Sequence, residues 1–142
     1  MRILEHHLKN KIMINVKDLM VGNWVYDTAL KRAIILNNLP YGIDLSNREG
    51  IPVTKEILKK IGFKEHKGIC PKTFYRYWDK EYRYKLDVDP DFCNSDRKFS
   101  IHIDNGDCET IGCGEFTYVH ELQNLVRCIS GHSLPIAKEM LQ

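Results

Sequence analysis

The stretch KTFYRYWDKEYRYKLDV, residues 72–88, carries the strongest structural signal in the sequence. Six aromatic and five basic residues fall within residues 72–85. From position 82 onward, aromatic or aliphatic side chains alternate with charged ones, a period of two that is typical of a half-buried β-strand. One face of this strand holds Tyr82, Tyr84, Leu86 and Val88, and the other holds Arg83, Lys85 and Asp87. We therefore predict a hairpin in which residues 73–78 turn at Asp79-Lys80 into a strand over residues 81–88.

Two interpretations of this hairpin stay open. In the first, its rings and cations project outward and bind a partner, because Tyr, Trp and Arg are the residue types that dominate protein interfaces. The candidate partner-binding residues are Tyr75, Arg76, Tyr77, Trp78, Lys80, Arg83 and Lys85. In the second, half of the rings fill the core. Tyr82 and Tyr84 are then buried with Leu86, and the phase of residues 75–78 is left undecided because strand phase near a turn is hard to read.

Apolar runs on both sides of the hairpin predict further strands. Gly22 and Asn23 lead into residues 24–26, and residues 32–36 (RAIIL) form a second run. A short strand at residues 42–45 lies between turn residues. Residues 99–103 alternate apolar and polar side chains, and the Asn-Gly pair at 105–106 is a strong hairpin signal before a strand over residues 109–116.

Two helices are well delimited. Thr54 is a suitable N-cap for a helix at about residues 54–61, and Gly62 follows it where a left-handed C-terminal residue is favoured. Thr117 can cap a second helix over residues 118–130, which Gly131 ends. The polar face of this second helix is another candidate surface, formed by His120, Gln123, Asn124 and Arg127.

These elements predict an α+β fold: one small domain with an antiparallel sheet, which can curl toward a barrel, and two main helices. A length of 142 residues with 43% apolar content fits one domain. We assign residues 13–142 to this domain and residues 1–12 to a mobile N-terminal arm or extension. No stretch is apolar enough to span a bilayer, and Glu5, His6 and His7 interrupt any signal peptide. We expect a cytoplasmic protein that does not bind membranes.

The net charge is only +2, but the charges are unevenly distributed. Residues 55–85 contain ten basic and four acidic residues, and residues 86–142 contain four basic and ten acidic ones, so the segments carry +6 and −6. If these segments lie on different faces, the molecule is a strong dipole that steers toward a charged partner. If they interleave in one sheet, the charges pair. The sequence leaves both arrangements open.

No catalytic or cofactor-binding motif is present, so we predict a non-enzymatic protein without a cofactor or metal. Five cysteines, an odd number without regular spacing, fit free thiols in a reducing compartment. Zinc bound by His66, Cys70, Cys108 and Cys113 is a weaker alternative, because the spacing lacks paired CxxC motifs. Residues 87–98 lack the glycine and glutamate of a calcium loop. Gly112-Cys113-Gly114 looks like a nucleophile with His120 or His132 as base, but glycines in a strand more often mark a close backbone approach.

Three segments resemble a family of small, largely uncharacterised proteins from phages and mobile elements of Bacteroidetes. They are LMVGNWVY (19–26), IPVTKEILKKIGF (51–63) and YVHELQNLVRCISGHSL (118–134). The resemblance spans most of the chain from residue 13, but the aromatic hairpin is particular to this sequence. It implies a small binding protein inside a bacterial host cell, including anti-CRISPR-type inhibitors, and it supplies no catalytic residues.

Two functional hypotheses follow. The first is a non-enzymatic inhibitor or modulator that docks on a host protein or ribonucleoprotein through residues 72–85. The alternative is direct binding of single-stranded RNA or DNA, with bases stacked on Tyr75, Tyr77 or Tyr82 and phosphates bound by Arg76, Lys80, Arg83 and Lys85. The balanced overall charge favours the first hypothesis, because nucleic-acid-binding domains are usually basic. The oligomeric state is not indicated.

Overall fold

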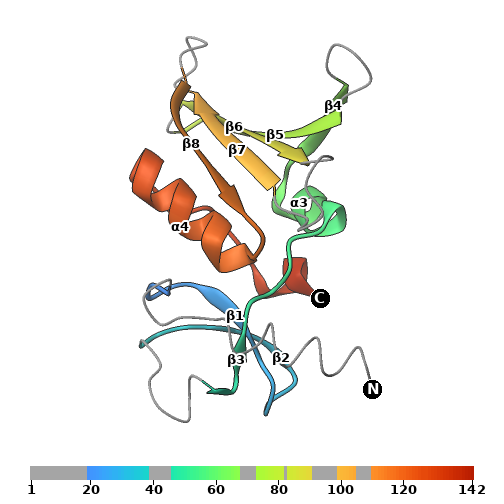
Figure 1. Ribbon diagram of the computed structural model, residues 1–142, viewed down its shortest axis with the longest axis vertical. Coiled ribbons are helices and arrows are strands. Elements are labelled where there is room, and N and C mark those ends of the chain that lie inside the picture. Colours follow the sequence, from blue (N-terminus) through green and yellow to red (C-terminus); the bar gives the residue numbers. More distant parts are fainter. Residues whose placement is uncertain (1–18, 39–45, 68–72, 82, 91–98, 105–109) are drawn as a thin grey trace.

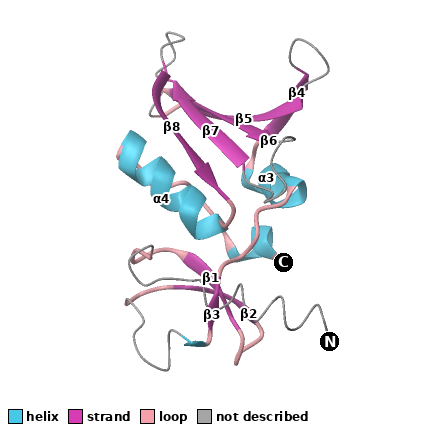
Figure 2. Ribbon diagram, viewed as in Figure 1, coloured by secondary structure: helices cyan, strands magenta, loops and turns pink. Residues whose placement is uncertain are grey.

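The computed structural model describes residues 19–38, 46–67, 73–81, 83–90, 99–104 and 110–142. These residues form an α+β fold with two antiparallel sheets, one of three strands and one of five. Helix α4 lies between the two sheets, and α3 lies beside the larger one (Figures 1 and 2). The predicted arm at residues 1–12, the strand at 42–45 and the turn at 105–106 lie outside the described residues.

The smaller sheet has the strand order β2-β1-β3. Strand β1 (Trp24–Asp27) pairs with β2 (Arg32–Ile35) and with the two-residue β3 (Arg48–Glu49). The two strands predicted near residues 24–26 and 32–36 are therefore confirmed. A small apolar cluster of Leu19, Val25 and Leu36 is buried under this sheet.

The larger sheet is a meander with the strand order β4-β5-β6-β7-β8. Its strands are β4 (Lys64–Lys67), β5 (Thr73–Asp79), β6 (Tyr84–Pro90), β7 (Phe99–Asp104) and β8 (Thr110–Phe116). The predicted hairpin is confirmed, but its turn lies later than predicted, between Asp79 and Tyr84. Arg83 has a φ of 56° in this turn. The sheet is open rather than closed into a barrel.

Both predicted helices are present, as α3 (Lys55–Ile61) and α4 (Val119–Ser130). The Thr54 side chain accepts a hydrogen bond from Ile57 N at 3.2 Å, and Gly62 ends α3 with a φ of 121°. The N-cap of α4 is Tyr118 and not Thr117 as predicted, because Glu121 Oε1 accepts the Tyr118 amide at 3.0 Å and fixes the helix start there. A 3₁₀-helix, η2 (Lys138–Leu141), follows.

The main core lies between the larger sheet and the helices. Alternate residues of the central strands point toward α4 and are fully buried: Leu86, Val88, Ile101 and Ile103. They pack with helix residues Leu58, Leu122 and Val126, which are also fully buried. The predicted phase of residues 84–88 is therefore confirmed, and we call this side of the larger sheet its inner face.

Two glycines let α4 approach β8 closely. A Cβ atom built at Gly114 meets Leu125 Cδ2 at 2.7 Å, and one built at Gly112 meets Ile129 Cγ2 even closer. Real Cβ atoms avoid such contacts, so any side chain at these positions displaces the helix or its neighbours. This confirms that the glycines around Cys113 mark a close approach of backbone and helix.

None of the helices in the described part of the chain combines the length and apolar character needed to cross a membrane.

Candidate partner-binding surfaces

The rings predicted to bind a partner divide between the core and the surface. Tyr75 lies on the inner face with 2% of its surface exposed, so its assignment to a binding surface is wrong. Pairing with β4 on one side and β6 on the other buries it at the centre of the sheet. Tyr84 is buried as predicted, and Tyr82 lies outside the described residues. Two of the five described rings of the hairpin are thus buried in the core.

Tyr77 is intermediate between these cases. Its ring packs against Phe63, with centroids 5.4 Å apart, and also lies over Gly62 at the end of α3. Burial raises the pKa of the Tyr77 hydroxyl, and the negative charge of Asp79 raises it further. Tyr77 therefore connects the hairpin to α3, and only its edge is available to another molecule.

Trp78 is the one large ring of the described hairpin that is exposed, at 43%. It belongs to the outer face of the larger sheet, the side opposite to α4 (Figure 1). This outer face consists of the alternate residues that do not enter the core. They are Lys64, His66, Phe74, Arg76, Trp78, Lys85, Asp87, Asp89, Ser100, His102, Asp104, Cys113 and Glu115.

The side chain of Arg76 is already engaged by its neighbours on this face. Its Nε donates to Asp87 Oδ1 at 2.7 Å and its NH2 to Asp87 Oδ2 at 3.1 Å. The guanidinium also lies 5.2 Å from the Phe74 ring centroid, and His66 stacks on that ring at 5.5 Å. A partner that binds Arg76 must compete with this bidentate ion pair, so Arg76 is a weaker anchor than the sequence indicates.

The basic and acidic segments interleave in the larger sheet. Arg76 pairs with Asp87 across β5 and β6, and Lys85 lies opposite Asp104 across β6 and β7. On the outer face, Lys64, Arg76 and Lys85 oppose Asp87, Asp89, Asp104 and Glu115, or three positive charges against four negative ones. Basic residues gather toward β4 and β5 and acidic ones toward β6 to β8, so the face carries a gradient of charge but little net charge.

The exposed Cys113 lies opposite His102 in the sheet register, and His102 Nε2 is 3.8 Å from Asp89 Oδ2. This order of Cys, His and Asp occurs in some hydrolases, so it requires an explanation. Cys113 points away from α4, so the pairing with His120 that the sequence suggested is wrong. We interpret Cys113 as a surface residue.

Metal ligation finds no support in the described part of the chain. None of its His, Cys, Asp and Glu side chains cluster in groups of three or more that could hold an ion. Cys70 and Cys108 of the weaker zinc alternative, and Asp91 of the calcium-like spacing, lie outside the described residues.

The second candidate surface, on α4, is largely internal. His120 is 3% exposed and its ring stacks on Tyr118 at 5.7 Å, so placing it on a polar surface is wrong. The cover comes from a distant segment: Pro52 forms a bridge with Tyr118, and Ile51 O accepts from Val119 N at 2.8 Å. Burial raises the pKa of Tyr118, and the charges of Glu121 and Glu49 add to the effect.

Gln123 and Asn124 hold the start of β1 against α4. Gln123 Oε1 accepts from Trp24 N at 2.8 Å, and its Nε2 donates to Gly22 O at 3.2 Å. Asn23 Nδ2 donates to Asn124 Oδ1 at 2.8 Å. These side chains therefore recognise the chain's own Gly-Asn-Trp segment before any partner. Only Arg127 of the predicted surface is exposed.

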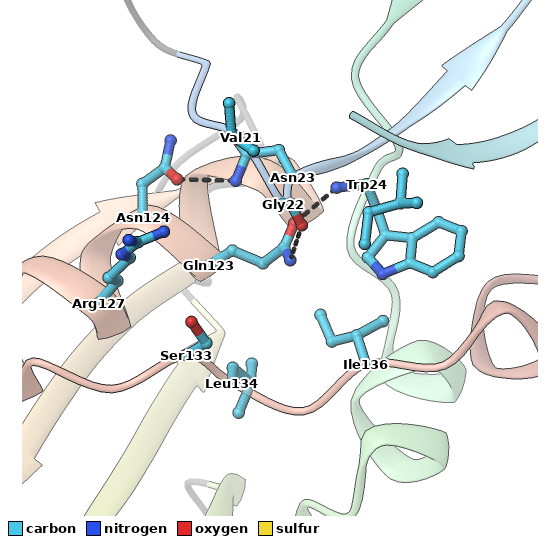
Figure 3. Close-up of a pocket in the computed structure, with 11 residues that line it drawn as sticks. Val21, Gly22, Asn23, Trp24, Gln123, Asn124, Arg127, Ser133, Leu134 and Ile136 are labelled. Carbon is cyan, nitrogen blue, oxygen red and sulfur yellow. Dashed lines mark hydrogen bonds between the residues drawn. The ribbon is translucent and has the colours of Figure 1, made fainter. Parts of the chain in front are cut away.

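A pocket of about 240 Å³ lies beside these contacts, between β1, β2, α4 and residues 133–136 (Figure 3). Its polar end holds Asn124, Arg127 and Ser133, its apolar end holds Trp24 and Ile136, and Ile35 also lines it. Two of the four large apolar side chains that are most exposed flank it, Val21 at 52% and Ile35 at 45%. Sequence reasoning missed this pocket, because its residues come from four separate segments.

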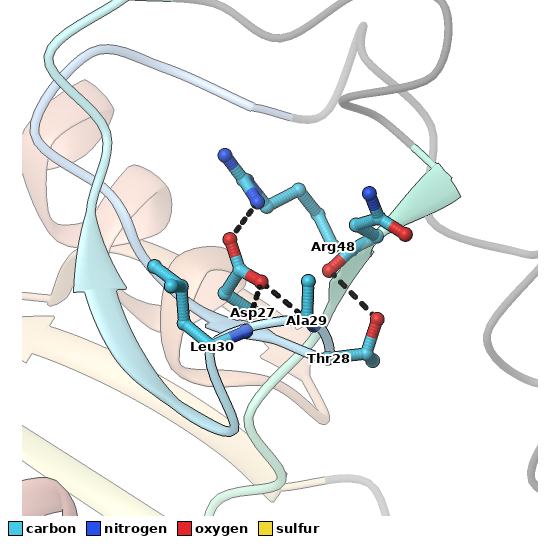
Figure 4. Close-up of polar contacts among 6 residues, drawn as sticks. Asp27, Thr28, Ala29, Leu30 and Arg48 are labelled. Atoms are coloured by element: carbon cyan, nitrogen blue, oxygen red, sulfur yellow. Dashed lines mark hydrogen bonds and ion pairs between the residues drawn. The ribbon is translucent and has the colours of Figure 1, made fainter.

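Asp27 and Arg48 form a second polar cluster, in the smaller sheet (Figure 4). Asp27 is 3% exposed; it pairs with Arg48 and accepts from Ala29 N at 2.8 Å and Leu30 N at 2.9 Å. Thr28 N donates to Asn47 O at 2.9 Å. These partners of Asp27 belong to the turn after β1 or to β3, so we interpret this cluster as structural support.

Comparison with known proteins finds no matching family model, no matching curated protein and no matching solved structure.

Proposed function

We propose that the protein acts by binding another protein or ribonucleoprotein, without catalysis, through the outer face of the larger sheet. The observation that carries this proposal is the exposed Trp78 on an open sheet face of mixed charge. Tryptophan is the residue most enriched at the energetic centres of interfaces. The exposed cations Lys80 and Arg83 follow it in the turn, and Lys85 lies opposite it on β6.

Mixed charge favours a protein surface over bare nucleic acid as the main contact. A phosphate backbone is attracted by a continuous positive surface, whereas four carboxylates share this face with its cations. A protein partner can place basic groups against β6 to β8 and acidic groups against β4 and β5. The contact core is then Trp78, Arg83 and Lys85, with Lys80 at its edge, whereas Tyr77 faces the helix side of the sheet.

The class of partner rests on the resemblance to phage and mobile-element proteins. Such small proteins act on host machinery, and an inhibitor of a nucleic-acid-based defence complex, of the anti-CRISPR type, fits a chain without a catalytic motif. The partner is accordingly a bacterial effector ribonucleoprotein or another nucleic-acid-handling machine of the host cell.

A second candidate function is binding of single-stranded RNA or DNA, and one local observation favours it. The exposed Trp78 ring is followed in the turn by two cations, Lys80 and Arg83. Two carboxylates, Asp79 and Glu81, lie in the same turn. A base stacked on Trp78 with its phosphates on this turn is the arrangement expected for such a site.

The test combines affinity capture of the partner with a measurement of CRISPR interference against phage in cells. The tagged protein is mixed with lysate of a Bacteroidetes host, with and without nuclease, and it is expressed in cells that carry an active CRISPR system. We expect a complex that survives nuclease treatment and a rise in the survival of targeted phage. The Trp78→Ala/Arg83→Ala variant should lose both effects, with the melting temperature lowered by less than about 3 °C, because both side chains are exposed.

The control is Leu30→Ala, which removes an equally exposed apolar side chain from the smaller sheet. Unchanged capture and interference by the double variant refute the outer face as the binding surface. Titration of the protein with a labelled 20-nucleotide RNA or DNA at two salt concentrations separates the second candidate. An affinity that falls steeply with salt and depends on Trp78 supports it, and no binding at low salt eliminates it.

A further inference from the structure

The pocket between β1, β2, α4 and residues 133–136 is chemically divided along its length. At one end the Trp24 ring and Ile136 form apolar walls, and at the other the Arg127 guanidinium lies near Asn124 and Ser133 (Figure 3). A ligand that satisfies both ends must carry both an apolar group and an anionic group. This pocket goes beyond the proposed function, which concerns the outer face of the larger sheet.

Arg127 supplies the charge complementarity. In the part of the chain that the structure describes, Arg127 has neither an ion pair nor a side-chain hydrogen bond, although it lies at the rim of the pocket. An exposed guanidinium offers several N–H donors in a planar fork that matches a carboxylate. The adjacent amides of Gln123 and Asn124 are held in place by their contacts to β1, so this end of the pocket is preorganised.

The size of the pocket indicates what it can accept. About 240 Å³ is below the roughly 300–1,000 Å³ of sites that bind drug-sized ligands and cofactors. It is on the scale of one large side chain, which is how hot-spot pockets at protein interfaces receive an anchor residue. The exposed Val21 and Ile35 at its rim extend the apolar surface along which further residues of a polypeptide can lie.

We propose that this pocket binds the C-terminal residue of a partner polypeptide, with an apolar side chain against Trp24 and Ile136 and the terminal carboxylate on Arg127. A chain end places a carboxylate next to the side chain of the same residue, so a single residue, which is about what 240 Å³ can hold, offers both of the groups that the pocket requires. Capture of a terminal carboxylate is an established mode of peptide recognition.

Three tripeptides test this proposal in ¹H–¹⁵N correlation spectra of the full chain. N-acetyl-Gly-Gly-Leu with a free carboxylate should shift the amides of Val21, Gly22 and Ser133 with a dissociation constant between about 0.1 and 5 mM, the range for a ligand of this size. The same peptide with a C-terminal amide should bind at least tenfold more weakly. N-acetyl-Gly-Gly-Gly, which keeps the carboxylate but lacks the apolar side chain, should bind at least fivefold more weakly.

Two variants and a control locate the site. Arg127→Gln should weaken the first peptide about tenfold and Ile35→Thr about threefold, and Arg32→Gln, an exposed arginine outside the pocket, should leave the affinity unchanged. Because all three positions are exposed, the variants should fold. The proposal is overturned if the amidated peptide binds as well as the free acid, or if no amide shifts at 10 mM peptide. Neither of these outcomes bears on Trp78 and the outer face.

Discussion

Replacing Gly112 by alanine tests how closely α4 must approach β8. The added Cβ would come within 3.0 Å of Ile129 Cδ1 and 3.1 Å of Cγ1, and still closer to Cγ2. Carbon atoms pack best at about 3.5–4.0 Å, so either the helix or the isoleucine must move by about 1 Å. Ile129 is branched at Cβ and has one strongly preferred rotamer in a helix, which leaves little room for the side chain alone to respond.

The expected cost follows from these contacts. Overpacking of this kind costs about 1–3 kcal/mol, and the loss of glycine's freedom in the unfolded chain offsets about 0.5–1 kcal/mol. We expect Gly112→Ala to lower the free energy of unfolding by about 2 kcal/mol and the melting temperature by about 6 °C. Gly114→Ala should cost less than about 1 kcal/mol, because its new Cβ meets the flexible tip of Leu125.

Urea unfolding followed by fluorescence of the buried Trp24 measures both variants. In the double variant Gly112→Ala/Ile129→Ala the clash is gone, so the two substitutions should be less destabilising together than the sum of their separate effects by at least about 1 kcal/mol. Equal losses in the two glycine variants, or strictly additive effects in the double variant, refute the reasoning that β8 and α4 are in contact through these glycines.

Two further predictions concern buried polar groups. Asp27→Asn should lower the free energy of unfolding, measured by urea denaturation, by about 3 kcal/mol. The substitution removes the negative charge that pairs with Arg48, whose side chain has little access to solvent. A loss below about 1 kcal/mol would show that the pair is not buried. Burial and the neighbouring Asp79 raise the pKa of Tyr84 to about 12, so the unfolded chain releases this proton first and stability should fall by about 2 kcal/mol as the pH rises from 10 to 12. Tyr84→Phe should remove this part of the fall and leave the parts due to Tyr77 and Tyr118, whose pKa values are also raised.

The parts of the fold that depend on local interactions could be predicted from the sequence. Thr54 and Gly62 delimit α3 through contacts within one or two turns, and the alternation of residues 84–88 fixes which side of β6 is buried. The start of α4 was misplaced by one residue because the capping contact of Glu121 reaches both Thr117 N and Tyr118 N. The sequence shows Glu121 as a capping residue, but it does not show which of these two amides marks the helix start.

The candidate site was harder to predict because burial is decided by distant segments. Tyr75 and Trp78 look alike in the sequence, but they are three positions apart on β5 and so point to opposite faces; pairing with β6 places Tyr75 beside Val88 in the core and Trp78 beside Lys85 outside. His120 lies off the apolar stripe of α4, yet it is buried and stacks on Tyr118, the residue that forms a bridge with the distant Pro52. Gln123 and Asn124 looked like solvent-exposed recognition residues, and instead they bind the β1 segment about 100 positions away.

That last pairing affects how the protein is made in the cell. Trp24 emerges from the ribosome 99 residues before Gln123, the side chain that receives its amide. At a synthesis rate of about 5–20 residues per second, the nascent β1–β2 hairpin spends about 5–20 s without the helix that secures it. During this interval the apolar side chains of Val21, Trp24 and Ile35 are accessible to chaperones, and premature docking on another chain competes with folding. Translation speed over residues 36–123 should therefore influence the yield of native protein.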